Sequence, residues 1–218
     1  MLAGIAGPVI FNLGWMIAQV WQPDAYDPVA HTISDMYAYG APNAIFLLSC
    51  VTLCGIGTIL FAILAVRPTV AGHWTGTMSW LSIALSIFGL GSVTAFVGRV
   101  DCQLAAPECT TAKQLSNLGG VLDSALSIVG ILAMVLAGLL LAAAMRRRPA
   151  LARFAGLCRL AGLVILALLI ANLLLTGLGW GGLAERGLAI IGAAELVLLA
   201  GLIFHQNRVG PTQPGLAA

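Results

Sequence analysis

Charged side chains are scarce in this sequence. Asp, Glu, Lys and Arg make up only 8% of its 218 residues, whereas 60% of the residues are hydrophobic. Soluble globular proteins carry about a quarter charged residues, so the composition excludes that class. The net charge of +2 also argues against a nucleic acid as partner, because such partners are bound by clustered cationic side chains.

Several motifs of enzyme and transport chemistry are missing as well. The sequence contains no Cys-x-x-Cys redox pair and no Gly-x-Ser-x-Gly nucleophile elbow. It has no evident internal repeat and no evident broken helix, which argues against an inverted-repeat transporter. With so few charged groups available, any chemistry has to rest on a small number of polar side chains.

Long hydrophobic runs, by contrast, fill most of the chain. A helix that spans the roughly 30 Å hydrocarbon core of a bilayer needs about 20 mainly apolar residues. Six segments meet this requirement: Ala3–Trp21, Pro42–Val66, Thr75–Gly98, Leu118–Met145, Phe154–Leu178 and Leu188–His205. We therefore expect an all-α polytopic transmembrane bundle of six helices over residues 1–205, followed by a disordered cytoplasmic tail over 206–218. The first segment lacks a preceding basic residue and a cleavage site, so we expect a retained helix.

The charges between these segments divide unevenly between two sides. One side carries only basic residues: Arg67, Arg146, Arg147, Arg148, Arg153, Arg159 and Arg208. The other side carries the remaining three basic residues together with six acidic ones. Because Lys and Arg near helix ends stay in the cytoplasm, we expect both termini to be cytoplasmic, in a plasma membrane. The loops Gln22–Ala41, Arg99–Asn117 and Gly179–Gly187 should then face outward.

Cysteine placement agrees with this assignment of sides. Cys102 and Cys109 lie in the second outward loop, whereas the other three cysteines fall within predicted helices. A disulfide that staples this short loop is expected in an oxidising compartment. A reactive redox pair is the alternative interpretation.

Metal sites are limited by the number of histidines, of which there are three. His31 should lie outside and the other two at the cytoplasmic edge, so no pair can meet across the bilayer to ligate a haem. A zinc site would have to combine His31 and Asp35 with Asp101 or Asp123. We predict no metal and no other cofactor.

Polar residues are densest in the first outward loop. If Pro28 opens a short helix there, His31, Ser34 and Asp35 stand at positions i, i+3 and i+4 on one face. The same three residue types make up a nucleophile with its base and orienting carboxylate. The pattern leaves three interpretations open: a polar or helix-capping role, contact with a ligand, and nucleophilic catalysis.

Two acidic residues, Asp123 and Glu195, fall inside predicted helices. An ionisable group in hydrocarbon costs several kcal/mol unless it is paired, neutral or hydrated, so both should point into the bundle. Asn172 adds an amide in the fifth helix. These groups either fix helix packing through bonds to neighbouring polar residues or contact a ligand, a proton or an ion.

A set of short motifs distributed along the chain resembles a known family. The motifs are AGIAGPVIF at Ala3–Phe11, HTISD at His31–Asp35, YGAPN at Tyr39–Asn43, DC at Asp101–Cys102 and GLAER at Gly182–Arg186. Together they resemble the bacterial membrane-protein family called domain of unknown function 998. The resemblance implies that such proteins retain Ser34, Asp35, Asp101 and Arg186, and it implies no activity. Arg186 can pair with Asp35 or Asp101, or clamp an anionic head group.

Three functions from different classes follow from these patterns. The leading one is a membrane protein that binds a lipid or other amphiphile in an outward-facing polar pocket, as a binding or accessory component. The expected lining is His31, Ser34, Asp35, Asp101, Asp123 and Arg186. The alternatives are an intramembrane hydrolase or transferase that uses His31, Ser34 and Asp35, and a proton-coupled transporter that uses Asp123 and Glu195. Membrane lipids are the expected partners, and stripes of small residues also suit a homo-oligomer or a membrane complex.

Overall fold

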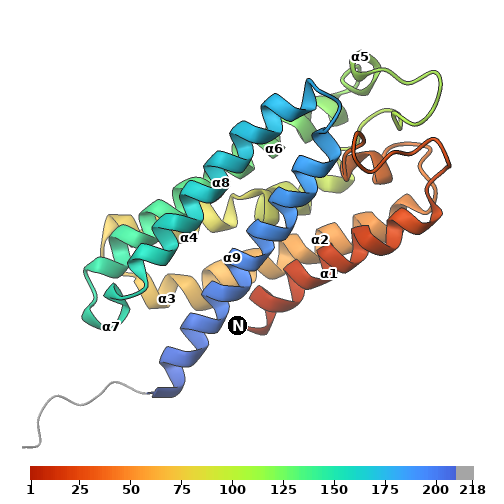
Figure 1. Ribbon diagram of the computed structural model, residues 1–218. Helices are drawn as coiled ribbons and strands as arrows, with labels where there is room; N and C mark the ends of the chain where they lie inside the picture. The colour runs from red at the N-terminus through yellow and green to blue at the C-terminus, as the bar shows by residue number, and fades with distance from the viewer. Residues whose placement is uncertain (210–218) are drawn as a thin grey trace, which may run out of the picture.

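A computed structural model describes residues 1–209, and within this range the chain contains helices and loops but no strands (Figure 1). Six helical segments in the range are long and apolar enough to cross a membrane, which confirms the predicted all-α bundle. These spans are Leu2–Trp21, Ala44–Val70, Trp74–Phe96, Leu118–Arg146, Ala155–Thr176 and Gly181–Gln206.

Each span is built around one main helix. The main helices are α1 (Leu2–Ala18), α2 (Ala44–Phe61), α4 (Trp74–Ala84), α6 (Leu118–Arg146), α8 (Ala155–Thr176) and α9 (Gly181–Val209). Short helices include α3 (Arg67–Val70), α5 (Thr111–Gln114), α7 (Pro149–Ala152) and the 3-10 helix η2 (Ser34–Tyr37). Helix α9 includes the first four residues of the segment predicted as a tail over 206–218, and residues 210–218 lie outside the described range.

The connections alternate between the two ends of the bundle. The loops at 22–43, 97–117 and 177–180 gather at the end that carries α5, which we call the loop end (Figure 1). Helices α3 and α7 lie at the other end. The three loops predicted to face outward therefore share one end of the molecule.

The last span begins earlier than the sequence predicted. Its helix starts at Gly181 rather than at Leu188, because a tight turn joins it directly to α8. Gly179 in this turn has a φ of 80°, a left-handed conformation that glycine adopts without steric cost. Glu185 and Arg186 consequently lie on the first turns of α9 and not in a loop.

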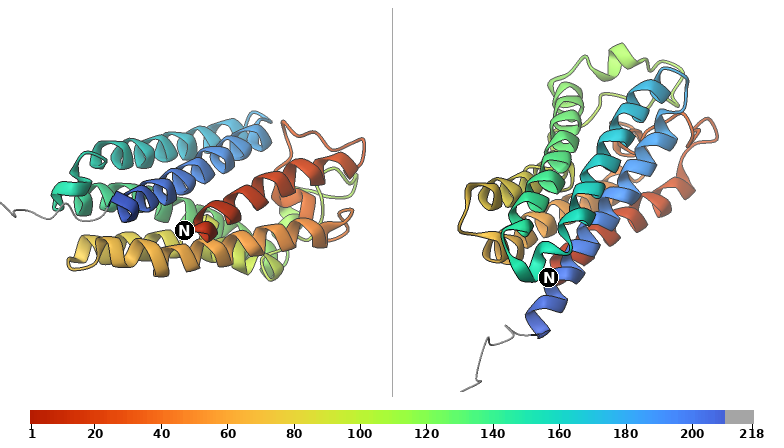
Figure 2. Two further views of the ribbon diagram at one scale, coloured as in Figure 1. Left: turned by 90° about the horizontal axis from the view of Figure 1, so that it is seen from below. Right: turned by 60° about the vertical axis from the view of Figure 1, so that its left-hand side comes forward.

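Glycines let helix backbones touch where the bundle is tightest. A Cβ atom on Gly7 of α1 would lie 3.1 Å from the carbonyl oxygen of Cys54 in α2. A Cβ atom on Gly138 of α6 would lie 2.8 Å from the Cα atom of Gly162 in α8. Helices α6 and α8 are thus in backbone contact in the half of the bundle away from the loop end, and they diverge towards the loop end (Figure 2).

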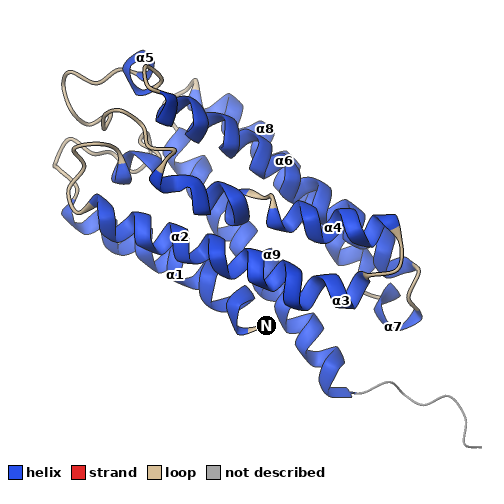
Figure 3. Cartoon of the chain, turned by 180° about the vertical axis from the view of Figure 1, so that it is seen from behind, coloured by secondary structure: helices blue, strands red, loops and turns tan. Residues whose placement is uncertain are grey.

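The third span is interrupted, whereas the sequence predicted one continuous helix over Thr75–Gly98. Helix α4 ends at Ala84, Ser86 is extended with φ −65° and ψ 171°, and a π-helical turn begins at Ile87 (Figure 3). The Ser86 hydroxyl donates a 2.7 Å hydrogen bond to the carbonyl oxygen of Ile83, which replaces part of the lost helical bonding. Irregular backbone at this depth is tolerated only when it is buried in protein or lines a cavity.

Candidate functional site

The half of the bundle nearest the loop end encloses a cavity of about 440 Å³. Residues from all six spans line it. Apolar side chains form the part that reaches deepest along the helices: Ile87, Phe88, Ile131, Met134 and Ile165. The part near the loop end carries polar side chains: Thr32, Ser34, Tyr37, Gln114, Asp123, Asn172 and Glu185. The cavity is therefore amphipathic along the direction of the helices.

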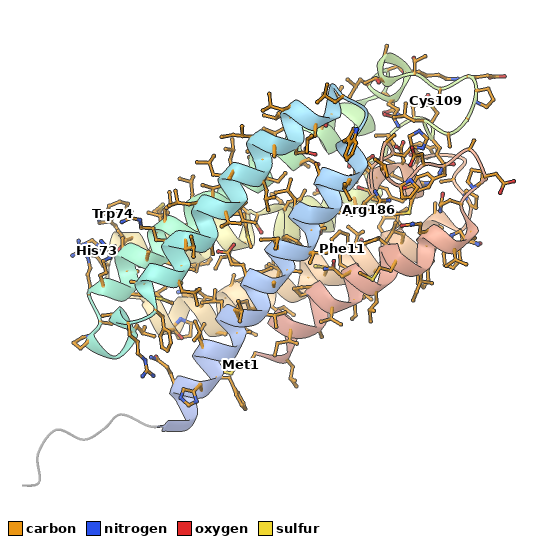
Figure 4. The ribbon with its side chains drawn as sticks, viewed as in Figure 1. Met1, Phe11, His73, Trp74, Cys109 and Arg186 are labelled. Atoms are coloured by element: carbon orange, nitrogen blue, oxygen red, sulfur yellow. A yellow bond between two sulfur atoms is a disulfide. The ribbon has the colours of Figure 1, made fainter. Side chains whose placement is uncertain are left out.

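Arg186, which does not line the cavity, fastens the loop at 22–43 to the first turns of α9 (Figure 4). Its Nη1 atom donates hydrogen bonds to the carbonyl oxygens of Pro28, His31 and Gly182 at 2.8, 2.9 and 2.9 Å. Its Nη2 atom donates to the Tyr26 hydroxyl over 2.6 Å. The guanidinium thus holds backbone carbonyls, and the predicted pairing of Arg186 with Asp35 or Asp101 is replaced by these contacts.

Glu185, which sequence reasoning missed, makes the adjacent contact on the cavity side. Its Oε2 atom accepts a 2.6 Å hydrogen bond from the backbone N–H of Ile33. Backbone bonds from Gly182 and Leu183 to the same loop complete the attachment: the two N–H groups donate to the carbonyl oxygens of Ala30 and Val29. The first turns of α9 and the loop at 22–43 are therefore attached to each other. Together with the loop at 97–117 they border the cavity at the loop end, and we call these three segments the roof.

Asp35 joins the loop at 22–43 to the loop at 97–117. Its side chain is fully buried, and its Oδ2 atom accepts from the backbone N–H and the hydroxyl of Thr32. Its Oδ1 atom accepts from the backbone N–H of Leu104 at 3.2 Å and from the Gln114 amide at 2.6 Å. Gln114 also donates to the carbonyl oxygen of Cys102, which forms the predicted disulfide with Cys109. Asp35 is therefore a structural link, and its oxygens are occupied by protein donors.

Tyr37 and Asp123 meet under this roof, from η2 and α6. The Tyr37 hydroxyl donates a 3.1 Å hydrogen bond to Asp123 Oδ1. Burial is the main cause that raises the pKa of Tyr37 well above its usual value, and the nearby carboxylates of Asp123 and Glu185 raise it further. Tyr37 is therefore a neutral donor, which lets Asp123 face the cavity without an ion partner.

The predicted face with His31, Ser34 and Asp35 does not form. No helix opens at Pro28, where the chain makes a turn instead, and the only helical turn in this loop is η2, which starts at Ser34. The ring Nδ1 atom of His31 accepts from the backbone N–H of Asp27 over 3.1 Å. The Ser34 hydroxyl lies 2.9 Å from the Thr32 hydroxyl. Ser34 and Asp35 thus share the Thr32 hydroxyl, whereas the His31 ring is bonded to Asp27 instead, so the three side chains are not arranged as a nucleophilic relay.

The remaining predicted residues fall in different places. Ser34, Asp123 and Asn172 line the cavity, whereas His31, Asp35, Asp101 and Arg186 do not. Asp101 accepts a 3.1 Å hydrogen bond from Asn117, the residue that caps the start of α6. Glu195 lies elsewhere, at a separate pocket of about 40 Å³ between α6, α8 and α9. Asp123 and Glu195 therefore do not share one cavity.

Within residues 1–209, no three His, Cys, Asp or Glu side chains are grouped so that they could hold a metal ion. The zinc site that would combine His31 and Asp35 with Asp101 or Asp123 is therefore not assembled in this part of the chain.

The Tyr26 hydroxyl should make the roof sensitive to high pH. Burial raises its pKa from 10.0 to about 12, although the Arg186 guanidinium opposes the shift. A raised pKa means that stability is complete below pH 10 and is lost as the pH rises through 12, by about 2 kcal/mol. We expect the thermal midpoint of the detergent-solubilised protein to fall less steeply between pH 10 and 12 in Tyr26→Phe than in the wild type.

A control variant separates this effect from the loss of any phenol. Tyr39 is half exposed, and its ring lies 4.3 Å from the Arg99 guanidinium. Tyr39→Phe should leave the slope of midpoint against pH as in the wild type. Equal slopes in the wild type and Tyr26→Phe would contradict the role given to Tyr26.

Comparison with known proteins places the chain in a family but gives it no activity. No curated protein and no solved structure matches it. The family model described as "Protein of unknown function (DUF998)" matches residues 5–202, which is most of the chain and includes most of the first and last spans and everything between them. The protein therefore belongs to the DUF998 family of proteins of unknown function.

Proposed function

We propose that the cavity binds an amphiphile whose head group donates hydrogen bonds. The observation that carries this proposal is the amphipathic lining, with polar groups near the loop end and apolar groups deeper in the bundle. Cavities of roughly 300–1,000 Å³ are typical of small-molecule sites, and about 440 Å³ lies in this range. The cavity has room for a head group and part of one chain.

The charge of the lining specifies the head group. Two carboxyl groups, Asp123 and Glu185, line the cavity, and no Lys, Arg or His does so among the described residues. Arg186 and Arg99, two cations at the loop end, donate to backbone carbonyls of the loop at 22–43. An anionic head group would meet carboxyl groups without a compensating cation, whereas a primary amine would find acceptors. We therefore favour a cationic or hydroxyl-rich head group over an anionic one.

The side of the membrane follows from the uneven distribution of charge. The basic residues away from the loop end, among them the run Arg146–Arg148, favour a cytoplasmic position for that end. The loop end and the cavity would then face the outer leaflet of a plasma membrane. In this arrangement the protein acts as a binding or accessory component for an outer-leaflet amphiphile.

Binding of matched single-chain probes tests the proposal. We expect a long-chain primary amine to raise the thermal midpoint of the purified protein, and the fatty acid of equal chain length to have little effect. The isosteric change Asp123→Asn keeps an oxygen for Tyr37 but removes the negative charge, so amine affinity should fall at least tenfold, about 1.4 kcal/mol. Native mass spectrometry would identify any amphiphile that copurifies.

Glu195→Gln provides the matched control. It also removes a carboxyl group from the membrane region, but at the small separate pocket. This variant should bind the amine as the wild type does. Equal affinity for the amine and the fatty acid, or loss of amine binding in Glu195→Gln as well, would contradict the proposal.

A further inference from the structure

One wall of the cavity is also part of the outer surface of the bundle. Ile128 of α6 and Leu173 of α8 both line the cavity, yet 48% and 61% of their side-chain surface is exposed. Ser124 on α6 likewise lines the cavity and is exposed. In a transmembrane bundle, the surface at this position faces lipid. The cavity therefore borders the bilayer between α6 and α8.

The packing of α6 against α8 explains this opening. The two helices touch at Gly138 and Gly162, where backbone atoms are in direct contact. Nearer the loop end the contact is lost: α8 has no buried residue beyond Leu169, and α6 has only Gly120 before Gly130. The two helices thus form a wedge that widens towards the loop end (Figure 2).

Contacts between the loops at 22–43 and 97–117 cover part of the cavity at the loop end, where Thr111 and Leu115 also line it and are exposed. The Asp35 carboxylate binds the second outer loop through Leu104 and Gln114. The backbone N–H of Tyr39 donates to the carbonyl oxygen of Val100 at 3.1 Å, and the Arg99 side chain donates to two carbonyls of the first loop. A ligand that entered between these two loops would have to break these contacts, whereas one that entered from lipid between α6 and α8 would not.

We propose that the gap between α6 and α8 is a lateral portal, through which an amphiphile enters from the leaflet at the loop end. The inference rests on the proposed binding function and adds the route and the source of the ligand. From Leu118 at the start of α6 to Ile128 the portal extends roughly 15 Å at 1.5 Å per residue, which is about half of the hydrocarbon thickness. The head group reaches Asp123 and Glu185, while the chain passes between Ile128 and Leu173 into the leaflet.

Photo-crosslinking locates the chain of a bound probe directly. A long-chain primary amine with a diazirine at mid-chain would be added to the protein in phosphatidylcholine vesicles. We expect crosslinks within α6 and α8, on peptides that contain Ile128 or Leu173. Crosslinks confined to the loops at 22–43 and 101–117 would overturn the lateral route, even if the amine binds with the expected affinity.

Obstruction of the portal provides an independent kinetic test. Ser124→Trp places a bulky side chain at the exposed edge of the cavity, and both association and dissociation of the amine should slow at least tenfold. Ser49→Trp is the matched control, because Ser49 is also an exposed serine near the loop end of its helix, α2, but does not line the cavity. Unchanged rates in Ser124→Trp with normal binding would reject the portal, whereas absence of binding in the wild type would reject the binding function itself.

Discussion

Replacement of Arg186 by Met is expected to detach the loop at 22–43 from α9. Only 6% of the Arg186 surface is exposed, and its guanidinium satisfies the carbonyl oxygens of Pro28 and His31 and the hydroxyl of Tyr26. Met fills a similar volume but donates no hydrogen bond, so these buried acceptors lose their partner. A buried acceptor that is left without its hydrogen bond costs about 1–3 kcal/mol. Because the loop is part of the roof, amphiphile binding should be lost together with stability.

Limited proteolysis of reconstituted protein would measure this effect. The loop at 22–43 should become cleavable in Arg186→Met while the spans stay protected. Arg186→Lys should rescue the loop only in part, because an ammonium group cannot span the fork of acceptors that the guanidinium reaches. Arg159→Met is the control, since Arg159 is exposed on α8 and should tolerate the change within about 0.5 kcal/mol. A loop that remains protected in Arg186→Met would contradict the anchoring role.

The importance of Arg186 could be predicted from the sequence, but its partners could not. The pattern Gly-Leu-Ala-Glu-Arg identified Arg186 as important, and charge complementarity suggested Asp35 or Asp101 as its partner. The structure satisfies it with backbone carbonyls instead, and Asp35 with amide and hydroxyl donors. The sequence does not show which backbone groups a side chain will contact. A partner for Arg186 that is predicted from side chains alone is therefore a carboxylate. The same bias excluded Glu185 from the predicted site, because its partner is the N–H of Ile33.

The spans were predicted well because hydropathy determines them directly. All six were identified, and five begin within a few residues of the predicted position. The sixth begins seven residues earlier, at Gly181 instead of Leu188, because Glu185 and Arg186 lower the hydropathy of a segment that is nevertheless helical. The roof loop supplies partners for both charges, and these tertiary contacts are not visible in a hydropathy profile.

The cavity agrees only in part with the expected lining, since His31, Asp35, Asp101 and Arg186 do not line it. Ser34, Asp123 and Asn172 were among the polar residues expected near it, and they line it. Tyr37 and Gln114 were not considered, because one tyrosine and one glutamine in loops give no periodic or motif signal. The break in the third span at Ser86 was also missed. The residues on both sides of Ser86 are apolar enough to suggest a continuous helix.

Replacement of Gly138 by Leu is expected to separate α6 from α8 and destabilise the bundle. The new Cβ atom would lie 2.8 Å from Gly162 Cα and 2.9 Å from the carbonyl oxygen of Cys158, and both neighbours are backbone atoms that cannot rotate away. Overpacking of this kind costs about 3 kcal/mol, the upper part of the usual range, because whole helices have to move. Since this contact is the closed end of the wedge, its loss should also widen the portal.

Gly156→Leu is the matched control for this prediction. Gly156 lies in α8, the other helix of this contact, and nothing is within 4 Å of a Cβ atom placed there. Both substitutions gain a similar helix propensity, of about 0.5–1 kcal/mol, so the difference between the two variants reports packing alone. In matched detergent we expect Gly138→Leu to have a clearly lower thermal midpoint than Gly156→Leu. If Gly138→Leu remains folded, the amine should associate and dissociate faster than in the wild type, because the portal between α6 and α8 is wider. This effect is opposite to the one expected for Ser124→Trp. Equal midpoints for the two variants would mean that α6 and α8 are free to separate, and the wedge would then have no fixed closed end.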